Sequence, residues 1–199
     1  MPARSALVRL LPTPRRREVD HVDLRATPSR VWQLVRHTDL ARAPSIRALI
    51  GLRALPGSLP GRRVDTRLCI DDFRSTPECP GFQLLADEPL QQFTVGAIAR
   101  VERVQLSFVH IDDARGFADF GEPGFVKMGW SVSLASYGAG NSRLSFEWRI
   151  GATSARGWRA ACWYFALIGP GVRFVRRRVL GSLADELGWP APKRRALTA

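Results

Sequence analysis

The sequence predicts an α+β fold, in which a run of antiparallel strands lies between two short helices near the N-terminus and one long C-terminal helix. Three changes of periodicity predict it. Apolar residues recur at helical spacing after a short first strand, follow strand-like patterns from about residue 64 to 151, and return to helical spacing from residue 155. The 199 residues are enough for one domain with a hydrophobic core.

The first elements have the pattern of a strand, a turn and a helix. The strand covers about residues 19–24. Thr27 is a favourable N-cap, and Pro28 suits the first helical position because its fixed φ angle matches a helix and its missing N–H would find no partner there. A second helix is expected near residues 45–54, where the proline and glycine residues that follow end it.

Six segments between residues 64 and 151 are typical of antiparallel strands, because they are short and bounded by Gly, Pro, Asp and Asn. In the last segment four apolar residues alternate with Ser145, Glu147 and Arg149, which predicts one buried face. The stretch YGAGNSR before it predicts a hairpin turn. The segments are VDTRLCIDDF, GFQLLADEP, QQFTVGAIARV, QLSFVHI, FVKMGWSVSLASY and SRLSFEWRI.

The C-terminal part, from Ala155 to Leu187, has the spacing of a long helix that is kinked or broken at Gly169-Pro170-Gly171. Residues 160–172 carry no charge, but a helix that spans a bilayer needs about twenty such residues, so we expect no transmembrane anchor. The first half is apolar on nearly every side, which fits a helix held against a sheet.

The net charge of +12 comes from the two ends of the chain. Residues 1–17 contain five arginines and no acid, whereas acids and bases balance over residues 18–153. A nucleic-acid surface needs cations spread along a folded face, so we do not expect nucleic acid as a partner. Basic ends are typical of flexible segments, and a basic helix can contact an anionic membrane weakly. The candidates for that contact are Arg173, Arg176, Arg177 and Arg178.

The three cysteines, an odd number without metal-like spacing, favour a reducing compartment. The apolar run ALVRLL near the N-terminus is interrupted by an arginine and lacks a cleavage site, so we expect no secretory signal. We therefore expect a cytoplasmic protein, with peripheral membrane association as a second option.

The stretch VDLRATPSRVWQLV is similar to the first strand and helix of the START-like helix-grip superfamily, also called SRPBCC. Three further segments resemble an uncharacterised bacterial SRPBCC group: DDFRSTPECPGFQLLADEPLQQFTVGAIAR, FADFGEPGFVKMGWSVSL and LSFEWRIGATSARGWRAACWYFALIGPGVRFVRRRVL. The resemblance implies a helix-grip fold, in which a curved antiparallel sheet wraps around the long C-terminal helix and leaves an apolar cavity. It implies a START-like domain over residues 18–188, between a flexible basic segment, 1–17, and a flexible basic tail, 189–199.

Aromatic residues on the strands and on the last helix are the candidates for lining that cavity, and ordinary core packing is the competing interpretation. The candidate polar anchors are His110 and the pair Glu147 and Arg149, which share one side of a strand. If that side is the outer one, Glu147 and Arg149 pair with each other away from the cavity. The cavity candidates are Trp130, Phe146, Trp148, Trp163 and Phe165.

His110, Asp112 and Asp113 are of metal-ligand type, but no second histidine lies nearby, so a strand end entering a turn explains them better. Asp71 and Asp72 are adjacent in a predicted strand and would face opposite sides. The chain contains no nucleophile elbow, zinc motif, phosphate loop or dinucleotide fingerprint. We expect neither a metal nor a cofactor.

These observations leave three functions open. The first is binding of a hydrophobic small molecule or lipid in the cavity. The second is a polyketide cyclase or dehydratase type of enzyme that uses the same cavity. The third is a peripheral membrane or interaction protein that acts through its basic ends. Apolar walls favour the first, convergent buried polar side chains favour the second, and a filled core favours the third.

Overall fold

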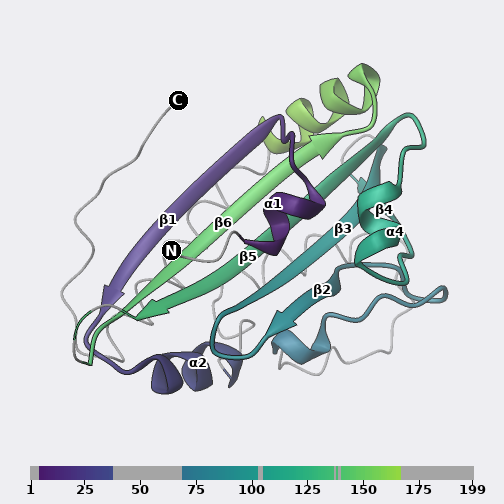
Figure 1. The fold of residues 1–199 in the computed structure, drawn as a ribbon. Helices are drawn as coiled ribbons and strands as arrows, with labels where there is room; N and C mark the ends of the chain where they lie inside the picture. The colour runs from purple at the N-terminus through teal and green to yellow at the C-terminus, as the bar shows by residue number, and fades with distance from the viewer. Residues whose placement is uncertain (1–4, 38–68, 103–104, 137, 139, 167–199) are drawn as a thin grey trace.

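The computed structural model describes residues 5–37, 69–102, 105–136, 138 and 140–166. These residues form a curved six-stranded antiparallel sheet in the order β1-β6-β5-β3-β2, with β4 paired to β3 (Figure 1). A helix over residues 155–166 follows the last strand. The α+β class, with an antiparallel sheet and a C-terminal helix, is therefore confirmed.

Five of the six predicted strand segments are strands, and β1 forms a sixth strand at the sheet's edge. The segment that begins at residue 64 differs, because its described part contains a 3-10 turn, η2 (Ile70–Asp72). The second helix expected near residues 45–54 and the Gly169-Pro170-Gly171 kink lie outside the described residues. The strands are β1 (Arg16–Leu24), β2 (Gln83–Glu88), β3 (Gln92–Glu102), β4 (Gln105–Val109), β5 (Phe125–Ser136) and β6 (Ser142–Ala152). The helices are α1 (Ala6–Leu10), α2 (Pro28–His37) and α4 (Ala114–Asp119).

One face of the sheet carries most of the aromatic side chains, and we call it the aromatic face. Residues directly opposite each other in an antiparallel pair point to the same side. Phe93 on β3 lies opposite Val132 on β5, and Val95 lies opposite Trp130, which in turn lies opposite Trp148 on β6. The alternation along each strand therefore gathers apolar residues from three adjacent strands into one continuous surface.

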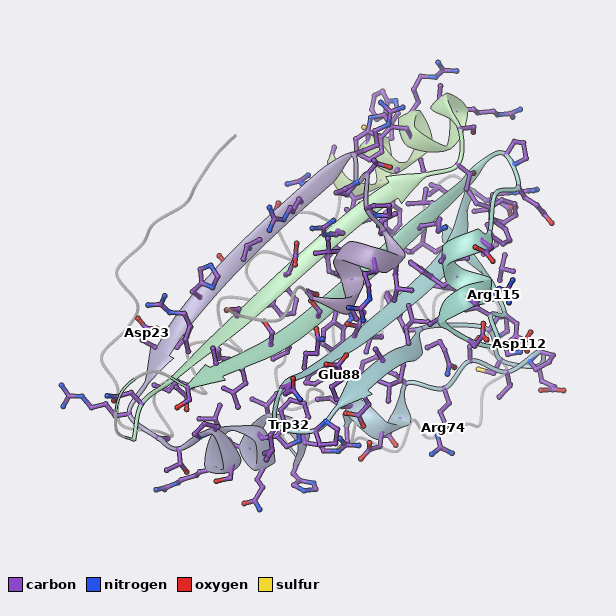
Figure 2. All side chains as sticks on the ribbon, viewed as in Figure 1. Asp23, Trp32, Arg74, Glu88, Asp112 and Arg115 are labelled. Carbon is purple, nitrogen blue, oxygen red and sulfur yellow. The ribbon has the colours of Figure 1, made fainter. Side chains whose placement is uncertain are left out.

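The helix α2 packs against one end of the aromatic face (Figure 1). Val31, Trp32 and Val35 are buried, at the spacing that places residues on one side of a helix. The Trp32 ring meets Phe93 edge to face, with 5.8 Å between the ring centroids. In Figure 2 Trp32 is labelled where α2 meets the sheet. The helical stripe predicted after Pro28 is thus the side that enters the core.

The opposite face of the sheet is covered by α1 and α4, and we call it the α1 face (Figure 1). Leu7 of α1 is fully buried. The strand residues that lie beneath Leu7 and Leu11 are glycines, Gly129 on β5 and Gly151 on β6. A Cβ atom at Gly129 would lie 2.5 Å from Leu7 Cδ1, and one at Gly151 would lie 2.9 Å from Leu11 Cδ1. The two glycines therefore allow α1 to approach the sheet closely.

In the segment that was expected to be flexible, the structure describes residues 5–17, which include the short helix α1 and the start of β1. The Ser5 side chain accepts a hydrogen bond from Leu7 N and caps α1, and β1 begins at Arg16. The physical reason lies in the run ALVRLL. Burial of the apolar side chains of Ala6, Leu7 and Leu11 stabilises the helix, while Arg9 between them stays exposed. An arginine inside a short apolar run therefore marks the outer side of a helix.

The helix over residues 155–166, which we call the terminal helix, packs against the end of the sheet through its first turns. Ser154 Oγ accepts a hydrogen bond from Gly157 N, and Gly157 lies so close to β5 that a Cβ there would be 2.8 Å from the Phe125 carbonyl oxygen. Ala161 is fully buried, in a cluster with Val126, Met128 and Ile150 from the aromatic face, and Phe165 packs against that cluster. Within the described residues no helix is both long and apolar enough to cross a membrane.

Replacing Leu7 by alanine tests the packing of α1. We expect Leu7→Ala to lower the free energy of unfolding by about 2–5 kcal/mol, because a fully buried leucine leaves a cavity. The measurement is urea unfolding followed by circular dichroism. Arg9→Ala, an exposed position on the same helix, is the control and should change the free energy by less than about 0.5 kcal/mol. Equal effects of the two variants would contradict a packed α1.

Candidate functional site

The centre of the aromatic face is a cluster of rings around Trp130. The Trp130 ring stacks on Phe146 with a centroid distance of 5.8 Å and an interplanar angle of 22°. It meets Phe73 and Phe93 edge to face at 5.5 and 5.6 Å. These offsets are the ones that aromatic pairs prefer. The cluster is therefore a preformed apolar surface built from β3, β5, β6 and the segment after η2.

The largest side chains of this surface keep contact with solvent although they lie on interior strands. Trp130 and Trp148 are half-buried, whereas the aliphatic residues beside them on the same face, Met128, Val132 and Ile150, are buried. Tryptophan is seldom buried completely because it is large, and here the two rings leave part of the aromatic face in contact with solvent. The aromatic face thus has accessible apolar surface at its centre.

The predicted cavity candidates divide into two groups. Trp130, Phe146 and Trp148 lie together on the aromatic face, and Phe165 packs against its edge. Trp163 is different, because 82% of its surface is exposed. Trp163 is therefore not an interior residue in this structure, and its role as a cavity residue stays a prediction. The terminal helix is buried on the side of Ala161 and open on the side of Trp163, so it is not enclosed all round.

Glu147 and Arg149 were candidate anchors for a ligand, but they lie on the α1 face, opposite the aromatic surface. Both are buried. Arg149 Nε donates to Glu147 Oε1 at 2.9 Å, Arg17 Nε donates to the same oxygen at 2.7 Å, and Arg149 Nη1 donates to the Leu11 carbonyl at 2.8 Å. The pair is thus a buried structural ion pair under the N-terminal segment, and both faces of β6 hold buried residues where the sequence predicted one buried face.

Two acidic side chains that share the aromatic face are on β1, and the sequence analysis did not single them out. Glu18 lies opposite Trp148 and Asp20 opposite Phe146 in the β1–β6 register. Glu18 Oε1 also accepts a hydrogen bond from Arg16 Nη2 at 2.6 Å. The period-two spacing of Glu18, Asp20 and Val22 was the available signal, but only the pairing with β6 shows which face they share.

His110, the third candidate anchor, belongs to a chain of hydrogen bonds at the end of β4. Its Nδ1 lies 3.0 Å from Ser75 Oγ, and its Nε2 lies 3.1 Å from Asp112 Oδ1. Ser75 Oγ also accepts from Gly81 N at 3.2 Å. The order resembles a Ser-His-Asp triad, but the burial is reversed, because the serine is buried and the acid is almost fully exposed. The chain joins two loops, as expected for a strand end entering a turn.

The neighbouring acids also act as local structural groups. Asp113 Oδ1 accepts from Gly116 N at 2.7 Å and caps α4. Asp71 pairs with Arg36, and Asp72 accepts from Cys69 N. No group of three or more potential metal-ligating side chains occurs within the described part of the chain. The arginines at 173, 176, 177 and 178 lie outside the described residues, so their contact with a membrane stays a prediction.

Lys127 is a buried cation on the α1 face. Its Nζ donates to the carbonyl oxygens of Ala118 and Phe120 at 2.8 and 3.3 Å, and it lies 5.2 Å from the centre of the Phe117 ring. Burial away from water lowers the pKa of the Lys127 ammonium, and the nearby Asp119 carboxylate opposes this effect. Because its partners are carbonyl oxygens of the last turn and of the C-cap residue of α4, Lys127 holds that helix to the sheet.

The comparisons with known proteins show remote likeness only. No protein-family model and no curated protein matches the chain. Norcoclaurine synthase from Thalictrum flavum is 10% identical with a TM-score of 0.38, and the match covers 92% of this chain and 94% of that one. Protein Ms6760 from Mycobacterium smegmatis is 13% identical with a TM-score of 0.37, covering 89% and 93%. CalU16 from Micromonospora echinospora is 14% identical with a TM-score of 0.30, covering 86% and 87%.

Likeness at these scores carries no argument about function. The geometry of the described residues therefore carries the functional inference by itself.

Removing one partner of the buried ion pair should be more damaging than removing both. Glu147→Leu leaves the Arg149 guanidinium buried without its carboxylate, and we expect a loss of about 3–5 kcal/mol in the free energy of unfolding. The double variant Glu147→Leu/Arg149→Leu should recover most of that loss. Chemical denaturation of the wild type and the variants measures it, and a double variant less stable than Glu147→Leu would argue against a structural pair.

The lowered pKa of Lys127 predicts a pH dependence. Between the folded-state pKa and the usual value of 10.5, the unfolded chain binds more protons than the folded one, so stability should rise with pH. Lys127→Met lacks this group. We expect the difference in unfolding free energy, wild type minus Lys127→Met, to become more positive as the pH is raised toward 10.5. A flat or falling difference would contradict a desolvated lysine.

Proposed function

We propose that the aromatic face binds a hydrophobic small molecule or a lipid. The observation that carries the proposal is the accessible surface of Trp130 and Trp148 on interior strands, among aliphatic neighbours that are buried. Ligand sites for such molecules are lined mainly by apolar and aromatic side chains with few polar groups. The expected cavity between the sheet and the C-terminal helix stays a prediction, because the helix is described only to residue 166.

The chemistry of the surface sets the class of ligand. Trp130, Phe146 and Phe73 present ring faces and edges that favour flat or branched apolar groups. The carboxylates of Glu18 and Asp20 lie at the β1 edge of the same face. A ligand that follows this pattern is apolar over most of its length and places its polar end toward β1.

The enzymatic alternative has no comparable support. Its polar candidates on β6, Glu147 and Arg149, are paired on the opposite face of the sheet. Trp148, which follows Glu147 in the sequence, points to the aromatic face, and a side chain cannot reach across the sheet. Binding is therefore the function that the geometry supports best.

The proposal is tested by titrating the full-length protein with the neutral fluorescent probe N-phenyl-1-naphthylamine. Trp148→Leu removes an accessible ring from the aromatic face, and we expect it to weaken the probe's Kd at least about fivefold, as the loss of one buried aromatic contact would. Trp163→Leu removes an equally large but solvent-exposed ring and serves as the matched control. It should leave the Kd within about twofold.

Saturable binding that weakens in Trp148→Leu and not in Trp163→Leu supports the proposal. Absence of saturable binding by the wild type, or equal effects of the two variants, would overturn it. Native mass spectrometry of protein purified from its own host would then identify a ligand that stays bound through purification.

A further inference from the structure

The exposed side of the terminal helix forms a second surface that the proposed function does not use. We infer that this side, over residues 155–166, is a docking surface for the interface of an anionic membrane, with Trp163 as the inserted residue and Arg156 and Arg159 as its headgroup contacts. The inference does not depend on a ligand at the aromatic face.

The exposure of Trp163 is the first observation. Only two large apolar residues are exposed among the described residues, Leu90 and Trp163, and Trp163 has the greater exposed fraction, 82% against 49%. A tryptophan exposed to water on a helix lacks the favourable free energy that burial of its ring would give. Its amphipathic ring is suited to the level of lipid headgroups, where tryptophan is enriched in membrane proteins.

The spacing along the helix is the second observation. Arg156, Arg159 and Trp163 stand at positions i, i+3 and i+7, which lie close together on one side of an α-helix. Both arginines are exposed. The opposite side holds Ala161 and Phe165 and contacts the sheet, so the helix cannot rotate this surface away. The exposed residues of the helix are Ala155, Arg156, Arg159, Cys162, Trp163 and Ala166.

The charge of the helix is the third observation. Residues 155–166 contain two arginines and no acid. Neither Arg156 nor Arg159 forms an ion pair with any residue that the structure describes, although many other arginines do, such as Arg36 with Asp71 and Asp87. A partner with negative charge therefore complements this surface without competing against existing salt bridges.

The combination of one apolar ring and two flanking cations favours a membrane over a nucleic acid. Membrane-surface helices bury an apolar side chain at the acyl boundary while arginines contact anionic headgroups. A single-stranded nucleic acid instead needs several stacking rings along a basic groove, and among the described residues of this helix Trp163 is the one strongly exposed ring.

The decisive experiment is sedimentation of the full-length protein with vesicles at low ionic strength, using pure phosphatidylcholine or phosphatidylcholine with about one quarter phosphatidylserine. We expect binding to the anionic vesicles and little to the neutral ones. Trp163→Ala should lower the partition coefficient at least about fivefold. Arg156→Gln/Arg159→Gln should lower it about tenfold or more, because each arginine near an anionic membrane surface raises the partition coefficient several-fold.

The matched control is Arg115→Gln on α4. Arg115 is also exposed, with 89% of its side chain accessible, and Figure 2 shows it well away from the terminal helix. Arg115→Gln removes one positive charge, half of what the double variant removes, and should change the partition coefficient by less than about twofold. All variants are checked by circular dichroism, so that loss of binding is not confused with loss of the fold.

A label beside Trp163 gives an independent readout of position. Cys162 and Cys79 are both free and exposed, so each can carry an environment-sensitive fluorophore once the remaining cysteines are replaced by serine. The emission from Cys162 should shift to shorter wavelength on addition of anionic vesicles, whereas the emission from Cys79 should not.

Equal binding by wild type, Trp163→Ala and Arg156→Gln/Arg159→Gln would overturn the inference, because membrane contact would then come from another part of the chain. Equal binding to neutral and anionic vesicles would overturn the role of the arginines. Binding to single-stranded RNA without binding to vesicles would identify a nucleic-acid contact and would also overturn it.

Discussion

The burial of the Glu147–Arg149 ion pair on the α1 face of β6 is the constraint on which the rest of the structure depends. On one face Leu144 and Ile150 enter the aromatic core, and on the other Glu147 and Arg149 are buried under the N-terminal segment. Buried charges are tolerated only when they are paired and hydrogen-bonded. The Leu11 carbonyl is one of the required partners, so the segment before β1 is part of the fold.

This constraint separates the two faces by role. The α1 face is closed by α1 and α4. Its glycines leave room for the side chains of Leu7 and Leu11, and its lysine donates to a backbone carbonyl of α4. The aromatic face keeps accessible rings at its centre. A sheet that is sealed on one side and open to apolar contact on the other can hold a ligand without exposing the charges that stabilise it.

The terminal helix connects these features to the exterior. Its capped first turn and its glycine hold it against β5, while Ala161 and Phe165 join the edge of the aromatic cluster. The same geometry leaves Trp163 in solvent. The proposed ligand-binding face and the proposed membrane-docking surface therefore lie on two sides of this helix.

The sequence by itself determined the class of fold and most of the strands, because period-two and period-3.6 patterns and turn residues are local properties of the chain. The period-two pattern also placed Phe146 and Trp148 on one face of the last strand, whereas their role as ligand contacts stays a prediction. The alternation on β6 showed that Glu147 and Arg149 share a face, but it did not show which element covers that face.

Only the tertiary structure decided that question. The docking of residues 5–11, the burial of Glu147 and Arg149 beneath them, the placement of Glu18 and Asp20 beside the aromatic rings and the exposure of Trp163 all depend on contacts between residues far apart in the chain. A pattern reports which side chains point the same way along one element. It does not report what lies opposite them, and that is fixed by strand register and by the space that glycines leave for a neighbouring helix.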